Sequence, residues 1–212
     1  MAEATNDSTT RRQILRAALK HFANAGYAAT SVQQIVDTAK VSKPALYYHF
    51  HDKAALFEAL VHDAHDLRYR VLREAVVPGD HISAQLERVL VALWDCFRAN
   101  RALMRIAFST MFAAPGELPE NLNFMDRCER NFDFVLDLFK QAQKKGELDR
   151  TFDCEEIAYS FYGMANFYLK GHLVSPDWAL DRSMARRIVK LFLAGAGPKA
   201  GGKSKKEPKQ RR

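Results

Sequence analysis

The sequence has few of the features on which metalloproteins, membrane proteins and many enzymes depend. Its cysteines, Cys96, Cys128 and Cys154, are far apart and form no CxxC pair, which argues against a disulfide framework or a zinc site. His62 and His65 are three residues apart, but no carboxylate or cysteine set completes a metal site. The motifs GxSxG and GxxxxGKS/T are absent, as are a membrane-spanning apolar run and an apolar signal stretch. These absences predict a cytoplasmic protein without a cofactor, metal or membrane segment.

Positive charge is concentrated at the two ends of the chain. The net charge is +7, and residues 195–212 alone carry seven Lys or Arg and one acidic residue. Residues 8–57 carry seven basic and two acidic residues. A basic head favours a polyanionic partner at that end. The tail, rich in Gly, Pro and Lys, is predicted to be disordered, and it either adds non-specific DNA affinity or is simply solvated.

Apolar residues recur with helical spacing along the chain, which predicts an all-α fold. Residues 1–10 are expected to be flexible. Helices are then expected at 11–25, from Thr30 with a capping box formed by Thr30 and Gln33, at 43–50, and at 53–75 after a cap at Asp52. Longer helices follow at 81–99, 101–113, 119–145, 153–173 and 177–194, about nine in total.

The segment from Ser42 to Lys53 has the pattern of a short helix that meets an anion. Ser42 can cap the helix, and Pro44 falls in the first turn, where a missing N–H costs nothing. Leu46 and Phe50 are four residues apart and face the same way, toward a small core. The helix before it, the tight turn and this helix together have helix-turn-helix proportions.

The expected DNA contacts follow from these positions. Thr30, Ser31 and Lys53 lie at helix N-termini, which favour anions, while Tyr47 and His49 can reach phosphates. The start of the third helix and Tyr48 face outward, where Lys43 can donate to guanine and Ala45 can contact a thymine methyl. The tyrosines and the histidine could instead be ordinary surface residues. The full set of predicted DNA-binding residues is Thr30, Ser31, Gln33, Ser42, Lys43, Pro44, Ala45, Tyr47, Tyr48, His49 and Lys53.

A longer pattern with fixed spacing surrounds this segment. It runs through Ile14-Leu15-x-x-Ala18, Gly26-Tyr27, Thr30-Ser31-Val32-x-x-Ile35, Ala39-x-Val41-Ser42 and Leu46-Tyr47-Tyr48-His49-Phe50-x-x-Lys53-x-x-Leu56. In this pattern residues 11–57 resemble the DNA-binding domain of the tetracycline-repressor (TetR)/AcrR family. The resemblance implies phosphate contacts at Thr30, Tyr47, His49 and Lys53, with Lys43, Ala45 and Tyr48 nearer the bases. Pro44 departs from the glycine that many members carry there.

Bulky apolar side chains are frequent in the longer helices, where a plain core is the simplest interpretation. The resemblance implies an inducer pocket among these helices. We expect a small apolar or aromatic effector with few charges, because no buried arginine is evident, apart from Arg105 and Arg127 as residues to check. The predicted ligand-binding residues are Trp94, Phe97, Met104, Phe108, Met111, Phe112, Phe124, Cys128, Phe132, Tyr162 and Asn166.

The predicted organisation is a DNA-binding domain at 11–57, a ligand-binding and dimerisation domain at 58–194, and a tail at 195–212. The helices near 153–173 and 177–194 resemble the family's dimer-forming pair. The predicted function is a homodimeric repressor that binds a palindromic double-stranded DNA operator and is released by the effector. The alternatives are an architectural DNA-binding protein without a ligand and a helical-bundle enzyme with an accessory head.

Overall fold

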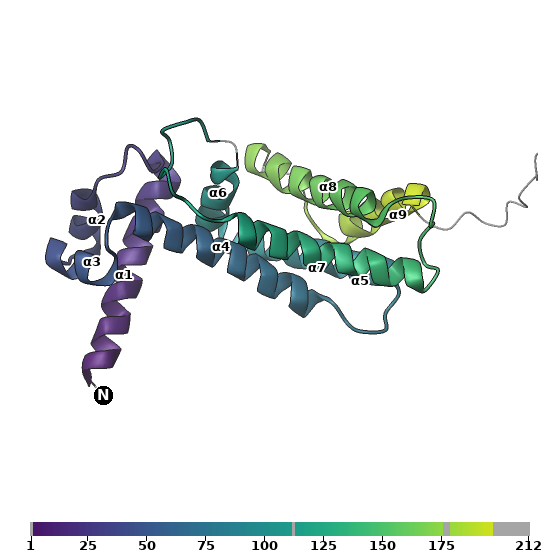
Figure 1. Ribbon diagram of the computed structural model, residues 1–212, viewed down its shortest axis with the longest axis horizontal. Coiled ribbons are helices and arrows are strands. Elements are labelled where there is room, and N and C mark those ends of the chain that lie inside the picture. The colour runs from purple at the N-terminus through teal and green to yellow at the C-terminus, as the bar shows by residue number, and fades with distance from the viewer. Residues whose placement is uncertain (1, 112, 176–178, 197–212) are drawn as a thin grey trace, which may run out of the picture. The chain divides into compact units, whose positions relative to one another are not determined.

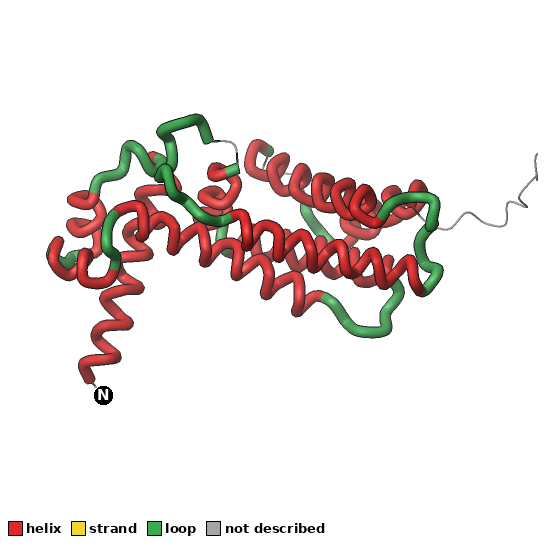
Figure 2. Tube along the Cα trace, in the orientation of Figure 1, coloured by secondary structure: helices red, strands yellow, loops and turns green. Residues whose placement is uncertain are grey.

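The computed structural model describes residues 2–111, 113–175 and 179–196 (Figure 1). These residues form helices and loops without a strand (Figure 2), which confirms the predicted all-α class. The helices are α1 (Ala2–Ala25), α2 (Val32–Ala39), α3 (Lys43–His49), α4 (Lys53–Ala75), α5 (Ile82–Ala99), α6 (Arg101–Thr110), α7 (Met125–Lys144), α8 (Cys154–Val174) and α9 (Arg182–Ala196).

Contacts divide the chain into two compact units. The first unit comprises residues 1–76 and 89–134, and the second comprises residues 77–88 and 135–212. The boundary predicted after residue 57 is a functional one, between a DNA-binding domain and a ligand-binding domain. It stays a prediction. The packing boundary lies elsewhere, so the DNA-binding helices share a compact unit with α6 and with parts of α5 and α7.

One apolar core holds α1 to α4 of the first unit together. It includes Phe22 of α1, Ile35 of α2, Leu46 of α3 and Phe57 of α4, all at most 3% exposed. The ring of Phe22 meets the ring of Phe57 edge-on, with centroids 5.1 Å apart. This core extends beyond the DNA-binding helices. Residues further along the chain also belong to it or pack against it: Ile106, and the partly buried Leu103, Leu118, Leu122 and Phe124.

Several helix limits differ from the prediction. The α1 helix begins at Ala2, so the segment expected to be flexible is helical from residue 2; it contains no Pro or Gly that would stop a helix. The α6 helix ends at Thr110 and α7 begins only at Met125, because the intervening segment contains two prolines and packs Leu118 and Leu122 on the core.

Other limits are close to those predicted. The α4 helix runs from Lys53 to Ala75 as expected, and Asp52 caps it by accepting the N–H of Ala55 at 2.7 Å. The α9 helix starts at Arg182, after a cap by Asp181, whereas residues 177–178 of the predicted helix lie outside the described residues. Gly195 and Ala196 complete α9, and the rest of the predicted tail, residues 197–212, also lies outside the described residues.

The second unit has its own core around α8 and α9. The rings of Phe139, Phe161 and Phe192 pack against one another with centroids 5.4 to 6.0 Å apart. Glu147 fixes the start of α5 by accepting the N–H of Ile82 at 2.6 Å. Within the part of the chain that the structure describes, no helix combines the length and apolar character needed to cross a bilayer.

Candidate nucleic-acid interface

Two capped helices and a tight turn form the helix-turn-helix. Ser31 caps α2: its hydroxyl accepts the backbone N–H of Gln34 at 3.2 Å, while the side-chain oxygen Oε1 of Gln34 accepts the backbone N–H of Ser31 at 2.8 Å. The capping box predicted for Thr30 and Gln33 is therefore wrong by one residue. Lys40 ends α2 with φ +55°, the left-handed conformation for which glycine is usual, and so turns the chain toward α3. Ser42 then caps α3, as predicted.

The α3 helix presents one face to the core and another to solvent. Leu46 is fully buried and Phe50 is 5% exposed, so both anchor the helix. Tyr48 is 78% exposed and Tyr47 48% exposed. Lys43 and Pro44 are exposed and Ala45 is half-buried, so the start of α3 and its outer face carry most of the predicted DNA-contacting groups. This face offers an ammonium and two phenol hydroxyls to a phosphate or base edge.

Three other predicted contacts have partners inside the protein. Thr30 is 2% exposed and its hydroxyl donates to the Gly26 carbonyl at 2.7 Å, so its predicted phosphate contact is corrected to a structural bond. The Lys53 ammonium donates to the carbonyls of Tyr27 and Thr30, at 3.0 and 2.9 Å, and lies 4.2 Å from the centre of the Tyr27 ring. Burial lowers the pKa of Lys53. Gln33 donates to Asp37 at 2.7 Å on the exposed surface of α2.

His49 faces the helix α1 instead of lying open to solvent. Its side chain is 7% exposed, and Nε2 lies 3.6 Å from the Asp7 carboxylate. The prediction missed this contact because it placed Asp7 in a flexible segment. Arg11, also on α1, lies over the ring of Phe50 at 5.1 Å. The extended α1 therefore supports α3 from the side, and an acidic group stands beside the predicted DNA-binding helix.

The predicted ligand-binding residues fall into several environments. In the first unit Trp94, Phe97 and Met104 are buried, and Phe97 contacts the half-buried Phe108 at 6.1 Å between ring centroids. Met111 is 52% exposed, which does not suit a pocket lining. Phe112 lies outside the described residues, Phe132 is half-buried, and Tyr162 and Asn166 belong to the second unit. The structure thus brings together only part of the predicted set.

A polar cluster of the first unit surrounds His65, and the sequence predicted only its members Phe124 and Cys128. His65 stacks on Phe124 at 5.9 Å, and both its ring nitrogens are 3.7 Å from the Cys128 sulfur. Asn131 is fully buried and donates to the His65 carbonyl at 3.2 Å. Arg68 is 9% exposed, which corrects the expectation that no arginine is buried. The burial of Arg68 could have been predicted from its position three residues after His65, on the inner face of α4.

Two fully buried residues of the first unit each have a side-chain polar atom without a hydrogen-bond partner among the described residues. These atoms are the indole Nε1 of Trp94 and the amide Oδ1 of Asn131. Buried polar groups normally have partners because desolvation alone is costly. Trp94 and Asn131 therefore leave one donor and one acceptor in the interior without a partner among the described residues.

The same burial makes His65 sensitive to pH. Burial, with the charge of Arg68 as the next cause, lowers the pKa of His65 from 6.5 to about 4. In the unfolded chain the imidazole protonates near its usual pKa of about 6.5, whereas in the folded chain it stays neutral. As pH falls from 6.5 toward 4, protons bind mainly to the unfolded chain. The stability present above pH 6.5 is then lost, by at most about 3 kcal/mol.

We therefore expect His65→Gln to flatten the dependence of stability on pH. Between pH 6.5 and 4, its urea midpoint should fall less than that of the unchanged protein, whatever its absolute stability. His51→Gln, at an exposed histidine, is the matched control and should keep the full acid loss. The measurement is urea unfolding followed by circular dichroism at several pH values. Equal acid losses in the unchanged protein and the His65 variant would contradict this assignment.

A capped helix-turn-helix with a solvent-facing second helix defines the class of helix-turn-helix DNA-binding proteins. Comparison with known proteins agrees. The family described as bacterial regulatory proteins, tetR family, matches residues 14–60. The HTH-type transcriptional regulator AcrR of Shigella flexneri is 32% identical over 193 residues, which cover 87% of each chain.

Two further similarities extend over most of the chain. The HTH-type transcriptional repressor BepR of Brucella suis is 26% identical over 166 residues, 76% of this chain and 78% of BepR. A crystal structure of a tetR-family regulatory protein from Rhodococcus RHA1 has the same fold, with a TM-score of 0.72 and 21% identity over 89% of this chain and 97% of that one. The chain belongs to the TetR/AcrR family of transcriptional regulators, which confirms the resemblance seen in the sequence.

Proposed function

We propose that this transcriptional regulator is a dimeric repressor that binds a palindromic operator through α3 and is released by a small effector. The observation that carries the proposal is the solvent-facing side of α3, which Leu46 and Phe50 hold in place from beneath. Repression is taken from the relative BepR, which is named a repressor. Because the DNA that such a protein binds is chromosomal, we place it in the cytoplasm.

The exposed residues of α3 divide into two kinds of contact. Lys43 and Tyr48 would meet base edges in the major groove, with Ala45 offering a methyl contact, while Tyr47 would bind a phosphate. The N-terminus of α2, which begins after the capping Ser31, would present its remaining backbone N–H groups to the DNA backbone. At the start of α3, Pro44 has no N–H and the Ser42 hydroxyl accepts the N–H of Ala45. Thr30, His49 and Lys53 would act indirectly, by fixing the elements that carry these groups.

The segment after α6 is the element that we propose to couple ligand to DNA. Asn123 is held by α4 at both backbone groups: its N–H donates to Glu58 at 3.3 Å, and its carbonyl lies 2.6 Å from Nε2 of His62. The neighbouring Phe124 packs against the core that holds the DNA-binding helices and also stacks on His65. A molecule that displaces Phe124 or His65 would therefore disturb the support of the head.

The effector site is proposed to lie beside the buried polar cluster. Its walls would be Trp94, Phe97 and Phe124, with Cys128 and Asn131 as polar groups. The unpaired Trp94 N–H calls for an acceptor on the ligand, and the unpaired Asn131 oxygen calls for a donor. We propose a small aromatic molecule that carries one group of each kind.

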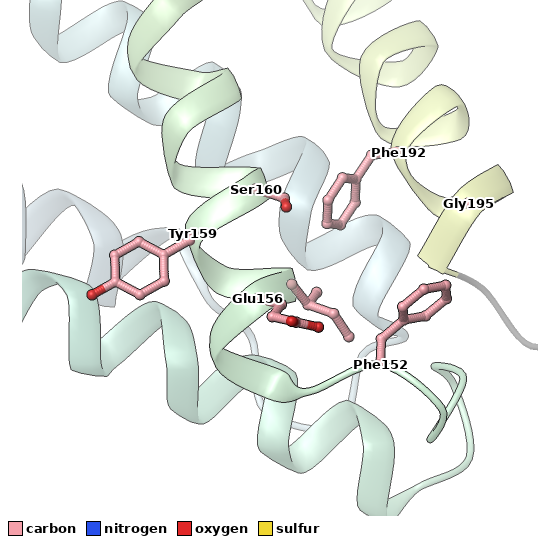
Figure 3. A pocket seen from close by; sticks show the side chains of 7 residues that line it. Phe152, Glu156, Tyr159, Ser160, Phe192 and Gly195 are labelled. Atoms are coloured by element: carbon pink, nitrogen blue, oxygen red, sulfur yellow. The ribbon is translucent and has the colours of Figure 1, made fainter.

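The dimer is proposed to form through α8 and α9. Phe167 of α8 and Leu191 of α9 are each 71% exposed, and Tyr159 of α8 is 65% exposed. Tyr159 also lines a groove of about 680 Å³, together with Phe152, Ser160 and Phe192 (Figure 3). Apolar side chains of this size are costly to leave in water, and a second copy of the chain would cover them. Two copies then set two α3 helices at a fixed spacing.

The alternatives predict a different interior. An architectural DNA-binding protein has no use for a ligand, so it would be expected to pair its buried polar atoms within its own core, unlike Trp94 and Asn131. The enzyme reading has little support, because the relatives over most of the chain are transcriptional regulators.

The proposed function is tested by coupling between two binding measurements. The operator is first selected from a random DNA pool, and small aromatic compounds are screened for those that raise the melting temperature. We expect such a compound to weaken operator binding by about 5- to 150-fold. Trp94→Phe removes the N–H and keeps a ring, so it should weaken the compound and leave ligand-free operator affinity unchanged. Compounds that bind tightly and never alter operator affinity would contradict the coupling, and failure to select any DNA would contradict the operator.

A further inference from the structure

A concave surface of the first unit lies between α4 and the start of α7. Asp66, Tyr69, Arg70, Arg73 and Glu74 recur at intervals of three and four along α4 and so share one of its faces. Arg130 of α7 faces them across a cleft of about 540 Å³, which we call the arginine cleft. Three guanidinium groups from two helices thus line one hollow.

Among the described residues, Arg130 is the one arginine of these three that forms an ion pair with a carboxylate. Arg130 donates to Asp66 at 2.5 Å, and Nε of Arg127 lies 3.4 Å from the same oxygen. Burial alone raises the pKa of Asp66, but the hydrogen bond from Arg130 and the charges of Arg127 and Arg130 outweigh it, so the pKa lies below its usual value. Asp66 is therefore ionised at neutral pH and is the carboxylate partner of both Arg127 and Arg130.

Arg70 and Arg73 are in a different situation. Among the described residues neither has a carboxylate oxygen within 4.0 Å, although Glu74 lines the same cleft. Arg73 lies 5.8 Å and Arg130 4.4 Å from the centre of the Tyr69 ring, and Phe134 fixes that ring from its edge at 5.9 Å. Two positively charged guanidinium groups, those of Arg73 and Arg130, therefore lie close to the same aromatic ring. In addition, Nε of Arg130 is buried and has no hydrogen-bond partner in the part of the chain that the structure describes.

We propose that the arginine cleft binds the phosphate group of a small phosphorylated molecule. The planar guanidinium fork matches the oxygens of a phosphate, and a phosphate bearing two negative charges can accept from Arg70, Arg73 and Arg130 at once. A carboxylate has only two oxygens to share among three such groups. The bound anion would also offset the repulsion between the arginines collected around Tyr69. This site is separate from the proposed effector site and does not depend on it.

The cleft suits a small anion better than a DNA backbone. Asp66 and Glu74 also line it, and two carboxylates would repel an extended row of phosphates. A compact ligand needs to place only one phosphate against the arginines. Because α4 begins directly after the helix-turn-helix, an anion that joins α4 to α7 would also tie the start of α7 to the helix that leads from the DNA-binding head.

The test is a calorimetric titration of the full chain at constant ionic strength. The probes are inorganic phosphate, pyrophosphate, ADP, citrate and a short DNA duplex of random sequence. The variant is Arg70→Gln with Arg73→Gln, and the matched control is Arg101→Gln with Arg105→Gln, which removes the same charge from exposed positions on α6. We expect saturable binding of pyrophosphate or ADP that weakens at least about tenfold in the cleft variant and is unchanged in the control.

The arms of the titration separate the sources of the phosphate. Tighter binding of ADP than of pyrophosphate would identify a nucleotide-like ligand, and the reverse would identify a free phosphate or diphosphate; both support the proposal. Citrate binding as tightly as pyrophosphate would overturn the assignment to phosphate. Equal weakening in the cleft variant and the control would overturn the site. If only the duplex lost affinity in the cleft variant, the arginines would belong to the DNA-binding surface and the proposal would be wrong.

Discussion

Replacing Leu191 with aspartate is expected to convert the protein to a monomer and to weaken operator binding by about 10²- to 10⁴-fold. Leu191 is 71% exposed on α9, so the change costs the isolated subunit little stability, yet it would bury a charge in the proposed dimer interface. A monomer binds one half-site of the operator and loses the gain in affinity that comes from binding two linked half-sites at once. Sedimentation velocity and an operator titration measure the two effects.

The matched control is Val77→Asp, which places the same charge at a residue that is 46% exposed in the same unit, in the loop between α4 and α5. It should remain dimeric and bind the operator normally. Circular dichroism confirms that both variants stay folded. A Leu191→Asp protein that remains a dimer with full operator affinity would place the interface elsewhere.

The reason to expect an interface there lies in the two faces of α8. One face packs Phe161, Ala165 and Leu169 into the core of the second unit, where each is at most 2% exposed. Another side of the same helix leaves Tyr159 and Phe167 in solvent. A surface helix normally has one apolar stripe, so a helix with apolar side chains on a second side is expected to have a second partner.

Features set by local signals were predictable from the sequence. The limits of α4 follow from a capping aspartate at one end and a Pro-Gly pair beyond the other. The inward face of α3 follows from the spacing of Leu46 and Phe50, and both are buried. In each case the cause lies within a few residues of the effect.

Features that depend on distant contacts were not predictable in the same way. The sequence could not show that Asp7 meets His49, because that contact requires α1 to extend back to Ala2. The late start of α7 depends on Leu118 and Leu122 packing on the DNA-binding core, which competes with a helical pattern in those residues. Even the cap of α2 moved by one residue, since Thr30 finds a partner in Gly26 and leaves the role to Ser31.

Leu46→Ala tests whether the DNA-binding face depends on the core beneath it. Leu46 is fully buried among α1, α2 and α4, so its loss removes apolar contacts and leaves a cavity. The free energy of unfolding should fall by about 2–5 kcal/mol, as urea unfolding measures. Operator affinity should fall too, because α3 loses the anchor that fixes its outer face.

Tyr47→Ala is the matched change on the next residue of the same helix. Tyr47 is 48% exposed, so stability should change by about 0.5 kcal/mol or less. Operator affinity should nevertheless fall about tenfold, and by a similar factor on unrelated sequences, because the lost contact is to a phosphate. Titrations of both variants on operator and random DNA separate the two causes. If Leu46→Ala binds the operator normally while it is destabilised, the outer face of α3 does not need its buried anchor. If Tyr47→Ala binds normally, Tyr47 does not face the DNA.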